Sequence, residues 1–222
     1  MNIRTVSRVV GASALVLGPL AVAVPITVTD AGQASTADQL AGYAANLDTA
    51  LVSNLLLFPL MLLVPAMIYA ARLAWQRAPV LAFIGGGLSA LGWMAGLMSI
   101  GTGQIALYQG AQMADRAAAA TLIDAMNGDP VYGTLVGIFV IGHIVGMILL
   151  GVALWRSRAA ARWAASCYVA YPILHFVSGM THPLLDRAAT LLLLAGSVML
   201  AITVTRTAAE APPERQPVAV AA

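Results

Sequence analysis

Two histidines of this sequence fall inside long apolar stretches, where ionisable side chains are rare and usually functional. His143 lies in the middle of a stretch at 131–155, and His175 lies in a stretch at 163–181. A neutral imidazole can donate one hydrogen bond and accept another, so either side chain could hold a polar group of a ligand. Each could equally serve as an ordinary hydrogen bond between two helices.

His175 belongs to a stripe of polar residues within its stretch. Residues spaced by three and four positions share one side of a helix. The stripe consists of Tyr168, Tyr171, His175, Ser178 and His182. Because polar side chains are costly against lipid, we expect this side to face the interior of a helical bundle.

Further polar candidates lie near the ends of other apolar stretches. They are Asn54, Gln104, Tyr108 and Tyr132. With His143, His175, Tyr168, Tyr171 and Ser178, they are the predicted lining of a polar pocket in the outer leaflet for a small lipophilic molecule. Each also has a structural interpretation, since tyrosines pack at membrane interfaces and an asparagine can join two helices.

Six apolar stretches are long enough to position these residues within a membrane. About 20 apolar residues cross the hydrocarbon core as a helix, and bare backbone polar groups are not tolerated there. The stretches cover about 9–29, 50–71, 79–108, 131–155, 163–181 and 187–206. The predicted fold is therefore all-α, a polytopic membrane bundle of six transmembrane helices formed by residues 1–207.

The charged residues predict the orientation of this bundle. Nine of the 11 basic residues flank one set of alternate gaps, and only Arg116 and Arg187 occupy the other set. Basic residues concentrate on the cytoplasmic side, so both termini should be cytoplasmic. Seven aspartates lie in the opposite gaps. We expect a bacterial cytoplasmic membrane protein with a disordered cytoplasmic tail at 208–222.

The first stretch has a second interpretation as a cleaved signal peptide, because a basic segment precedes it and Ala34 could end a cleavage site. That alternative would leave five spans. Its apolar run is longer than is usual for a signal peptide, which favours a retained helix.

Glycines and loops predict the packing. Gly133 and Gly137, and also Gly142 and Gly146, have the GxxxG spacing that lets helices approach closely. The two pairs fall on opposite sides of one helix, which predicts a central position for the fourth span. The outer segment 30–49 is polar, and 109–130 is expected to form a short surface helix.

Composition excludes several classes of function. With 60% hydrophobic and 9% charged residues, the chain is no ordinary soluble domain and has no nucleic-acid-binding patch. The absence of lysine rules out a lysine nucleophile or Schiff base. Cys167 is the single cysteine, so no internal disulfide can form.

No cofactor or metal is predicted. Counted from the outer helix ends, His143 would be about 18 Å deep and His175 about 9 Å deep, which disfavours both as ligands of one haem. A metal site from His175, His182 and Asp186 is a minor alternative.

The stretch from Gly142 to Ala164, GHIVGMILLGVALWRSRAAARWA, resembles small six-helix integral membrane proteins of actinobacterial type. The matching residues are Gly142, His143, Gly146, Leu149, Leu150, Gly151, Ala153, Leu154, Trp155, Arg156, Arg162, Trp163 and Ala164. The resemblance covers about the last three helices. It implies a fold and a location, but no activity.

Three functions follow as hypotheses. The leading one is binding or movement of a small lipophilic molecule in transport, resistance or sensing. The alternative is an intramembrane enzyme such as an isoprenoid cyclase, with Asp48 or Asp129 as the acid and Tyr108, Tyr132, Tyr168 or Tyr171 as aromatic shelter. The third is a structural subunit that packs against a membrane partner or a second copy. An acid that points into an aromatic-lined pocket would favour the enzyme, whereas acids that all face water would favour the first hypothesis.

Overall fold

The computed structural model describes residues 3–28, 35–178 and 183–209, and all regular structure within them is helical. This confirms the all-α prediction. Within these residues, five helices are long and apolar enough to cross a membrane. They cover Thr5–Val24, Leu47–Ala74, Pro79–Gln112, Pro130–Ser157 and Leu184–Arg206.

Each of the six predicted stretches contains helix. The first corresponds to α1 (Ile3–Val28), and the second to α3 (Leu47–Leu55), α4 (Leu57–Leu60) and α5 (Leu63–Ala74). The third is α6 (Pro79–Gln112), and the fourth comprises α8 (Pro130–Ile141), the π-helix η1 (Gly142–Gly146) and α9 (Met147–Ser157). The last two are α10 (Arg162–Ser178) and α11 (Pro183–Ala209).

The fifth stretch is the short one. Its helix α10 has 17 residues, which is about 25 Å of helix against a hydrocarbon core of about 30 Å. The predicted stretch 163–181 continues into residues 179–182, which lie outside the described residues.

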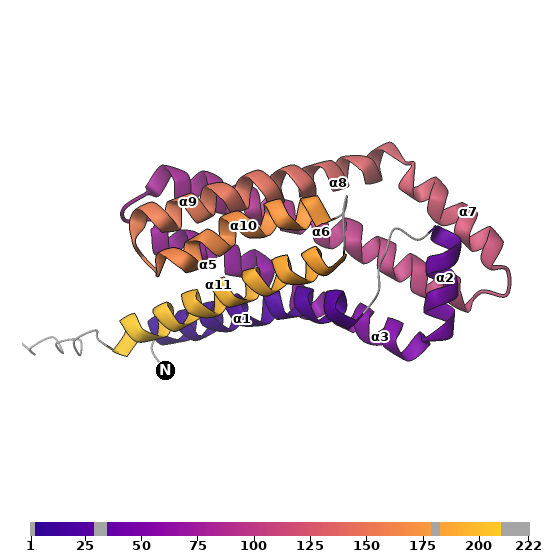
Figure 1. Ribbon diagram of the computed structural model, residues 1–222, viewed down its shortest axis with the longest axis horizontal. Coiled ribbons are helices and arrows are strands. Elements are labelled where there is room, and N and C mark those ends of the chain that lie inside the picture. Colours follow the sequence, from indigo (N-terminus) through magenta and orange to yellow (C-terminus); the bar gives the residue numbers. More distant parts are fainter. Residues whose placement is uncertain (1–2, 29–34, 179–182, 210–222) are drawn as a thin grey trace, which may run out of the picture.

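The long helices form a closed bundle (Figure 1). α1 packs between α11 and α5, α11 packs against α10, and α10 packs against α9. α9 completes the ring through α6 and α5. The core includes the fully buried side chains of Leu15, Met67, Leu150, Tyr168 and Leu193.

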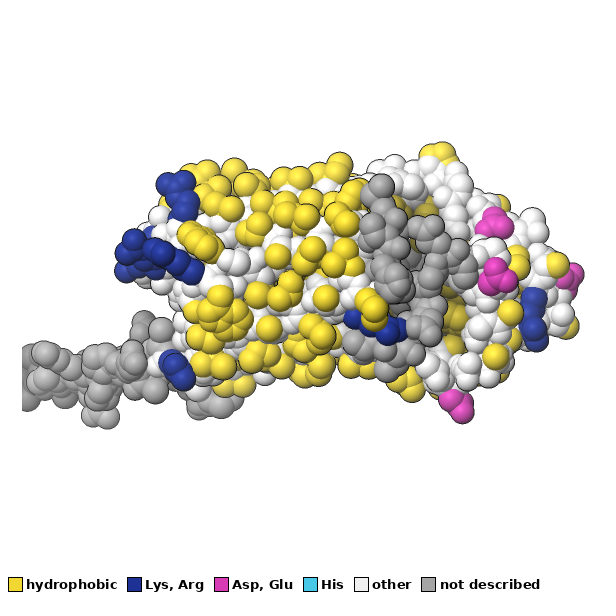
Figure 2. Space-filling view, viewed as in Figure 1, with side chains coloured by type: hydrophobic (Ala, Val, Ile, Leu, Met, Phe, Trp, Pro, Cys, Tyr) yellow, Lys and Arg dark blue, Asp and Glu magenta, His cyan; other side chains and the backbone are white. Residues whose placement is uncertain are grey.

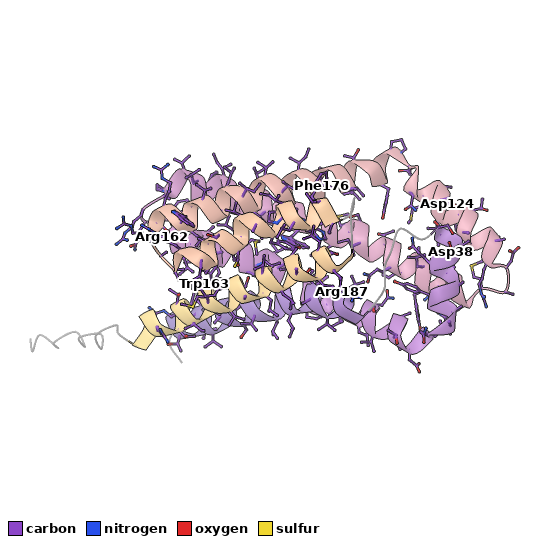
Figure 3. All side chains as sticks on the ribbon, in the orientation of Figure 1. Asp38, Asp124, Arg162, Trp163, Phe176 and Arg187 are labelled. Carbon is purple, nitrogen blue, oxygen red and sulfur yellow. The ribbon has the colours of Figure 1, made fainter. Side chains whose placement is uncertain are left out.

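Charged side chains gather at opposite ends of the bundle (Figure 2). One end, here called the arginine end, carries Arg72, Arg77, Arg156, Arg158 and Arg162. On the face shown, apolar side chains cover most of the surface between this end and the opposite one, where the acidic side chains lie, and Arg187 lies between the two ends. Figure 3 places Arg162 at the arginine end, and Asp38 and Asp124 at the far end. Such an exposed apolar surface is unfavourable in water, and the helices beneath it include those long and apolar enough to cross a membrane.

A small second core closes the end opposite the arginines. There α2 (Thr36–Ala45) and α7 (Arg116–Asn127) pack against the end of α6 around Leu40, Ala111, Ala119 and Ile123. Thr36 donates a hydrogen bond of 2.5 Å to Asp124, which joins α2 to α7. We call this unit the cap. Tyr43 of α2 packs against this second core, and burial raises the pKa of its hydroxyl group.

The cap contains one predicted helix and one helix that was not predicted. The short helix predicted within 109–130 is present as α7, whereas α2 within the polar segment 30–49 was not predicted. α6 has 34 residues, which is about 51 Å of helix and some 20 Å more than a bilayer core requires. Its C-terminal part therefore supports the cap.

The predicted glycine packing is half right. A Cβ atom on Gly142 would lie 2.6 Å from the Cα atom of Gly92, and one on Gly146 would overlap the backbone of Ser89. These glycines let the fourth span touch the α6 backbone. Around Gly133 and Gly137 there is open space, so the prediction for this pair is wrong. α8 has no buried residue, because it extends past the bundle toward the cap. Only the half of the fourth span nearer the arginine end is central.

Candidate functional site

Four of the long helices bring aromatic and imidazole side chains together around His143. The residues are Trp93 from α6, Phe139 from α8, His143 from η1, Tyr171 and His175 from α10, and Asp186 from α11. We call this group the histidine cluster. It combines groups that accept or donate hydrogen bonds with a largely apolar enclosure.

His143 occupies the centre of the cluster. Its ring centroid lies 4.9 Å from that of Trp93, 5.1 Å from those of Phe139 and Tyr171, and 5.4 Å from that of His175. The residue is 2% exposed. Such contacts hold the imidazole in one orientation.

His175 joins the cluster to α11. Its Nδ1 atom forms a short hydrogen bond with Oδ1 of Asp186. Both side chains are partly exposed, at 32% and 24% respectively. When the imidazole is neutral, Nδ1–H donates to the carboxylate, which leaves Nε2 as an acceptor. The pair thus places a hydrogen-bond acceptor of fixed tautomer beside Tyr171.

Several buried polar atoms in this region have no hydrogen-bond partner among the described residues. They are Nε2 of His143, Nε1 of Trp93, the hydroxyl of Tyr171 and the hydroxyl of Ser89. Ser89 lies one helical turn before Trp93 and touches η1 near Gly146. Unpaired buried polar atoms are costly in proteins, so a gathering of them indicates places where water or a ligand binds.

The backbone at His143 is also irregular. Residues Gly142–Gly146 form a turn of π-helix within an otherwise α-helical span. Short π-helices occur frequently at functional sites, because the extra residue redirects a side chain at a cost in stability. The flanking glycines permit the distortion to pack tightly against α6.

The contact between the two histidines overturns the depth estimate made from the sequence. His143 lies as many residues before Arg156 as His175 lies after Arg162. Both histidines are therefore about 20 Å from the arginine end. The estimate counted from the outer ends, and the fourth span extends past the bundle there. The argument against haem therefore rests on geometry instead. The two rings contact each other, with centroids 5.4 Å apart and an interplanar angle of 33°, whereas the axial ligands of one haem iron approach it from opposite sides.

The predicted ligand-binding residues separate into two groups. His143, Tyr171 and His175 meet in the cluster, and the Ser178 hydroxyl donates to the backbone of His175 at 2.6 Å. Tyr168 lies one turn away and bonds Ser197 at 2.8 Å. Gln104 is about 16 Å farther along α6 than Trp93, and Tyr108 lies beyond it.

The remaining two candidates also lie away from His143. Tyr132 donates to the backbone of Ser99 at 3.2 Å. Asn54, on α3, bonds the Ala50 carbonyl at 2.9 Å within its own helix. No hydrogen bond or ring contact within the described part of the chain joins Asn54, Gln104, Tyr108 or Tyr132 to the cluster.

Trp93 and Phe139 were missed by reasoning from the sequence. Both are ordinary apolar residues in an apolar stretch, and only the spacing of Phe139 four residues before His143 could have indicated a shared face. The glycines of α6 were missed as well. Gly92 and Gly96 have the same GxxxG spacing as the pairs recognised in the fourth span.

The acids proposed for an enzyme face water. Asp48 is exposed. Asp129 is exposed and caps α8, accepting bonds from the amides of Val131 and Tyr132 at 2.8 and 3.2 Å. Asp186 is the acid beside the aromatic rings. Among the described residues, no three His, Cys, Asp or Glu side chains are placed to hold a metal ion, and His182 lies outside the described residues.

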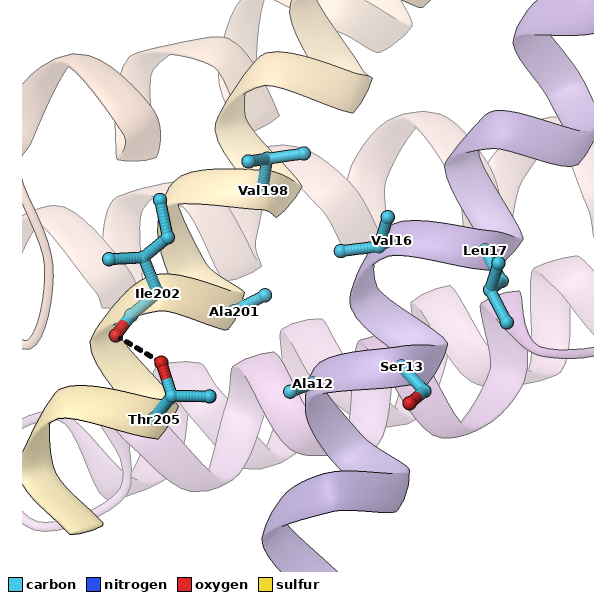
Figure 4. A pocket seen from close by; sticks show the side chains of 8 residues that line it. All are labelled: Ala12, Ser13, Val16, Leu17, Val198, Ala201, Ile202 and Thr205. Carbon is cyan, nitrogen blue, oxygen red and sulfur yellow. Dashed lines mark hydrogen bonds between the residues drawn. The ribbon is translucent and has the colours of Figure 1, made fainter. Parts of the chain in front are cut away.

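A separate groove of about 420 Å³ runs between α1 and α11 (Figure 4). None of the predicted ligand-binding residues lines it. Compared with known proteins, the chain matches no family model, no curated protein and no solved structure.

Proposed function

We propose that this chain is a six-span protein of a bacterial cytoplasmic membrane with both termini in the cytoplasm. The arginine distribution supports this orientation. On α11, Arg187 and Arg206 bracket a segment of about 28 Å, close to the thickness of the hydrocarbon core. α10 would be the sixth span. α1 contributes fully buried Leu15 to the core, which supports a retained first helix.

Reporter fusions test this orientation. A reporter at Ala222 should be active in the cytoplasm, and one inserted within 109–130 should be active outside it. A C-terminal reporter that is active only outside the cytoplasm would contradict the proposed topology.

We further propose that the protein binds or moves a small amphiphilic molecule at the histidine cluster. The observation that carries this proposal is the set of four unpaired polar atoms within the buried cluster and at Ser89 beside it. An ammonium group can donate to Nε2 of His143 and to the hydroxyl oxygens of Tyr171 and Ser89, which the protein leaves unpaired, whereas the Trp93 N–H needs an acceptor such as water. The exposed positions of Asp48 and Asp129 favour binding over a cyclase that uses either as its acid.

The chemistry of the cluster favours a cationic head on an apolar body. Ring faces attract cations, and the Asp186 carboxylate provides a counter-charge close to His175. An anion would instead meet the carboxylate and the negative faces of the rings. We therefore expect a lipophilic amine to bind more tightly than a carboxylate with the same apolar body.

Two matched compounds test this proposal, 4-phenylbutylamine and 4-phenylbutyrate. The measurement is thermal unfolding of the purified protein in detergent with increasing concentrations of each compound. The amine should raise the Tm by a few degrees, since about 1 kcal/mol corresponds to about 2–4 °C for a protein of this size. Asp186→Asn should abolish most of that rise.

A control variant separates the cluster from general effects of the compound. Asp48→Asn removes an equal charge at an exposed position and should leave the stabilisation by the amine intact. Equal effects of the amine and the carboxylate on the wild-type protein, or equal losses in both variants, would contradict binding at the histidine cluster.

A further inference from the structure

The groove between α1 and α11 is a second candidate site, and its chemistry differs from that of the histidine cluster. Its walls are mainly apolar and come from two of the helices that are long and apolar enough to cross a membrane (Figure 4). They consist of Ala12, Ser13, Val16, Leu17, Val198, Ala201, Ile202 and Thr205. Small residues such as Ala12 and Ala201 at the contact of the two helices leave the space between the larger side chains.

An arginine continues each wall toward the arginine end. Arg8 lies four residues before Ala12 on α1, and Arg206 lies four residues after Ile202 on α11. Residues four apart share a face of a helix, so both side chains leave their helices on the groove side. Arg8 is partly exposed and Arg206 is exposed. The long arginine side chains can reach along the surface to the membrane interface.

The polar side chains of the groove, Ser13 and Thr205, lie in the part nearer the arginine end. The Thr205 hydroxyl donates a hydrogen bond of 2.9 Å to the Ile202 carbonyl of its own helix (Figure 4). The hydroxyl oxygen of Thr205 can still accept a hydrogen bond. The other wall residues, apart from Ser13, offer only apolar atoms. An apolar groove with an arginine one helical turn beyond each wall matches a molecule with a hydrocarbon chain and an anionic head.

We propose that this groove binds one anionic phospholipid, with an acyl chain between α1 and α11 and the phosphate between Arg8 and Arg206. Basic residues near the membrane surface attract anionic headgroups, and arginine can bind two phosphate oxygens at once. A zwitterionic lipid would fill the same groove, but its ammonium group would weaken the attraction. The bound lipid would also bridge the first and last helices of the bundle.

Native mass spectrometry of the full chain tests the proposal. The protein, purified in detergent, is incubated with equal amounts of dioleoylphosphatidylglycerol and dioleoylphosphatidylcholine, and the retained lipid is counted. We expect one retained phosphatidylglycerol and about a thirtyfold preference over phosphatidylcholine, as two basic contacts would provide. The double variant Arg8→Gln/Arg206→Gln should bind the two lipids about equally.

The matched control is Arg156→Gln/Arg162→Gln, which removes the same charge from exposed positions at the same end of the molecule. This variant should keep the preference. Ser13→Phe, at an exposed position of the groove wall, should lower retention of both lipids by filling the groove. This second arm decides the question if the double variant does not fold.

Three results would overturn the proposal. They are equal retention of the two lipids by the wild-type protein, an equal loss of preference in the control variant, and unchanged retention in Ser13→Phe. The same spectra would also overturn the proposal if the wild-type protein were a dimer without bound lipid and Ser13→Phe were a monomer. That result would show that a second copy of the chain occupies the groove.

Discussion

At the scale of single residues, two buried tyrosines of α10 differ in how their hydroxyl groups are satisfied. Tyr168 and Tyr171 are both fully buried. The Tyr168 hydroxyl bonds Ser197, whereas the Tyr171 hydroxyl has no partner among the described residues. The first therefore has a structural role that joins α10 to α11, and the second is available to a ligand or to water.

Phenylalanine substitutions should separate these roles. Tyr168→Phe should lower the free energy of unfolding by about 1 kcal/mol, because it breaks a buried hydrogen bond and leaves Ser197 unpaired. Tyr171→Phe should change stability by less than about 0.5 kcal/mol while weakening stabilisation by 4-phenylbutylamine. Unfolding in detergent with and without the amine measures both. An equal loss of stability in both variants would mean that Tyr171 has a partner in the folded protein.

The two histidines should also respond differently to alanine. His143 contacts four rings, so His143→Ala should cost about 2–4 kcal/mol through the cavity it leaves. His175→Ala should leave the fold intact and impair binding, since this side chain is 32% exposed and holds Asp186. Ligand-induced Tm shifts per folded molecule, together with stability, measure the difference. Full binding by folded His175→Ala would remove His175 from the site.

At the scale of elements, the fourth span changes character along its length. Its half nearer the arginine end packs against α5, α6 and α10, while α8 runs along α6 toward the cap. The π-helix lies at this transition and presents His143 to the neighbouring helices. Because the π-helix lies between α8 and α9, one span can hold a buried histidine at its centre and a more exposed half, α8, toward the cap.

Leucine substitutions at two glycines test this division. Gly146→Leu should prevent folding or cost several kcal/mol, because its side chain would collide with the α6 backbone at Ser89. Gly137→Leu should be tolerated, since no atom lies within contact distance of its Cβ position. Expression level and thermal unfolding in detergent report the outcome. Severe destabilisation by Gly137→Leu would point to a neighbour that covers α8, such as a second copy of the chain.

At the scale of the whole molecule, the described residues form two cores of different kinds. The large core holds the bundle together within the apolar belt, and the small core closes the cap beyond it. The cap rests on α6 and depends on few buried side chains. We therefore expect the cap to open locally without unfolding of the bundle.

Two adjacent residues of α7 provide a matched test of the cap. Ile123 is 6% exposed and Leu122 is 70% exposed. Ile123→Ala should cost about 2 kcal/mol or more locally and increase hydrogen exchange in α2 and α7, with no change in α10. Leu122→Ala should leave exchange unchanged. If Ile123→Ala increased exchange equally in α10, the cap and the bundle would unfold as one unit.

The sequence alone determined the helical class, the approximate positions of the helices and the segregation of arginines from acids. These features depend on local composition, since a long apolar run must hydrogen-bond its own backbone in lipid. It also identified His143, Tyr171 and His175 as candidates, because polar side chains in such runs are rare.

The tertiary structure alone decided which residues meet. His143 and His175 share a depth because both lie equally far from the arginine end, and the sequence does not show how far a helix extends past the bundle. The same extension left Gly133 and Gly137 in open space and separated Gln104 and Tyr108 from the cluster. Relative depth depends on where each helix lies along its neighbours, and long-range packing determines that position.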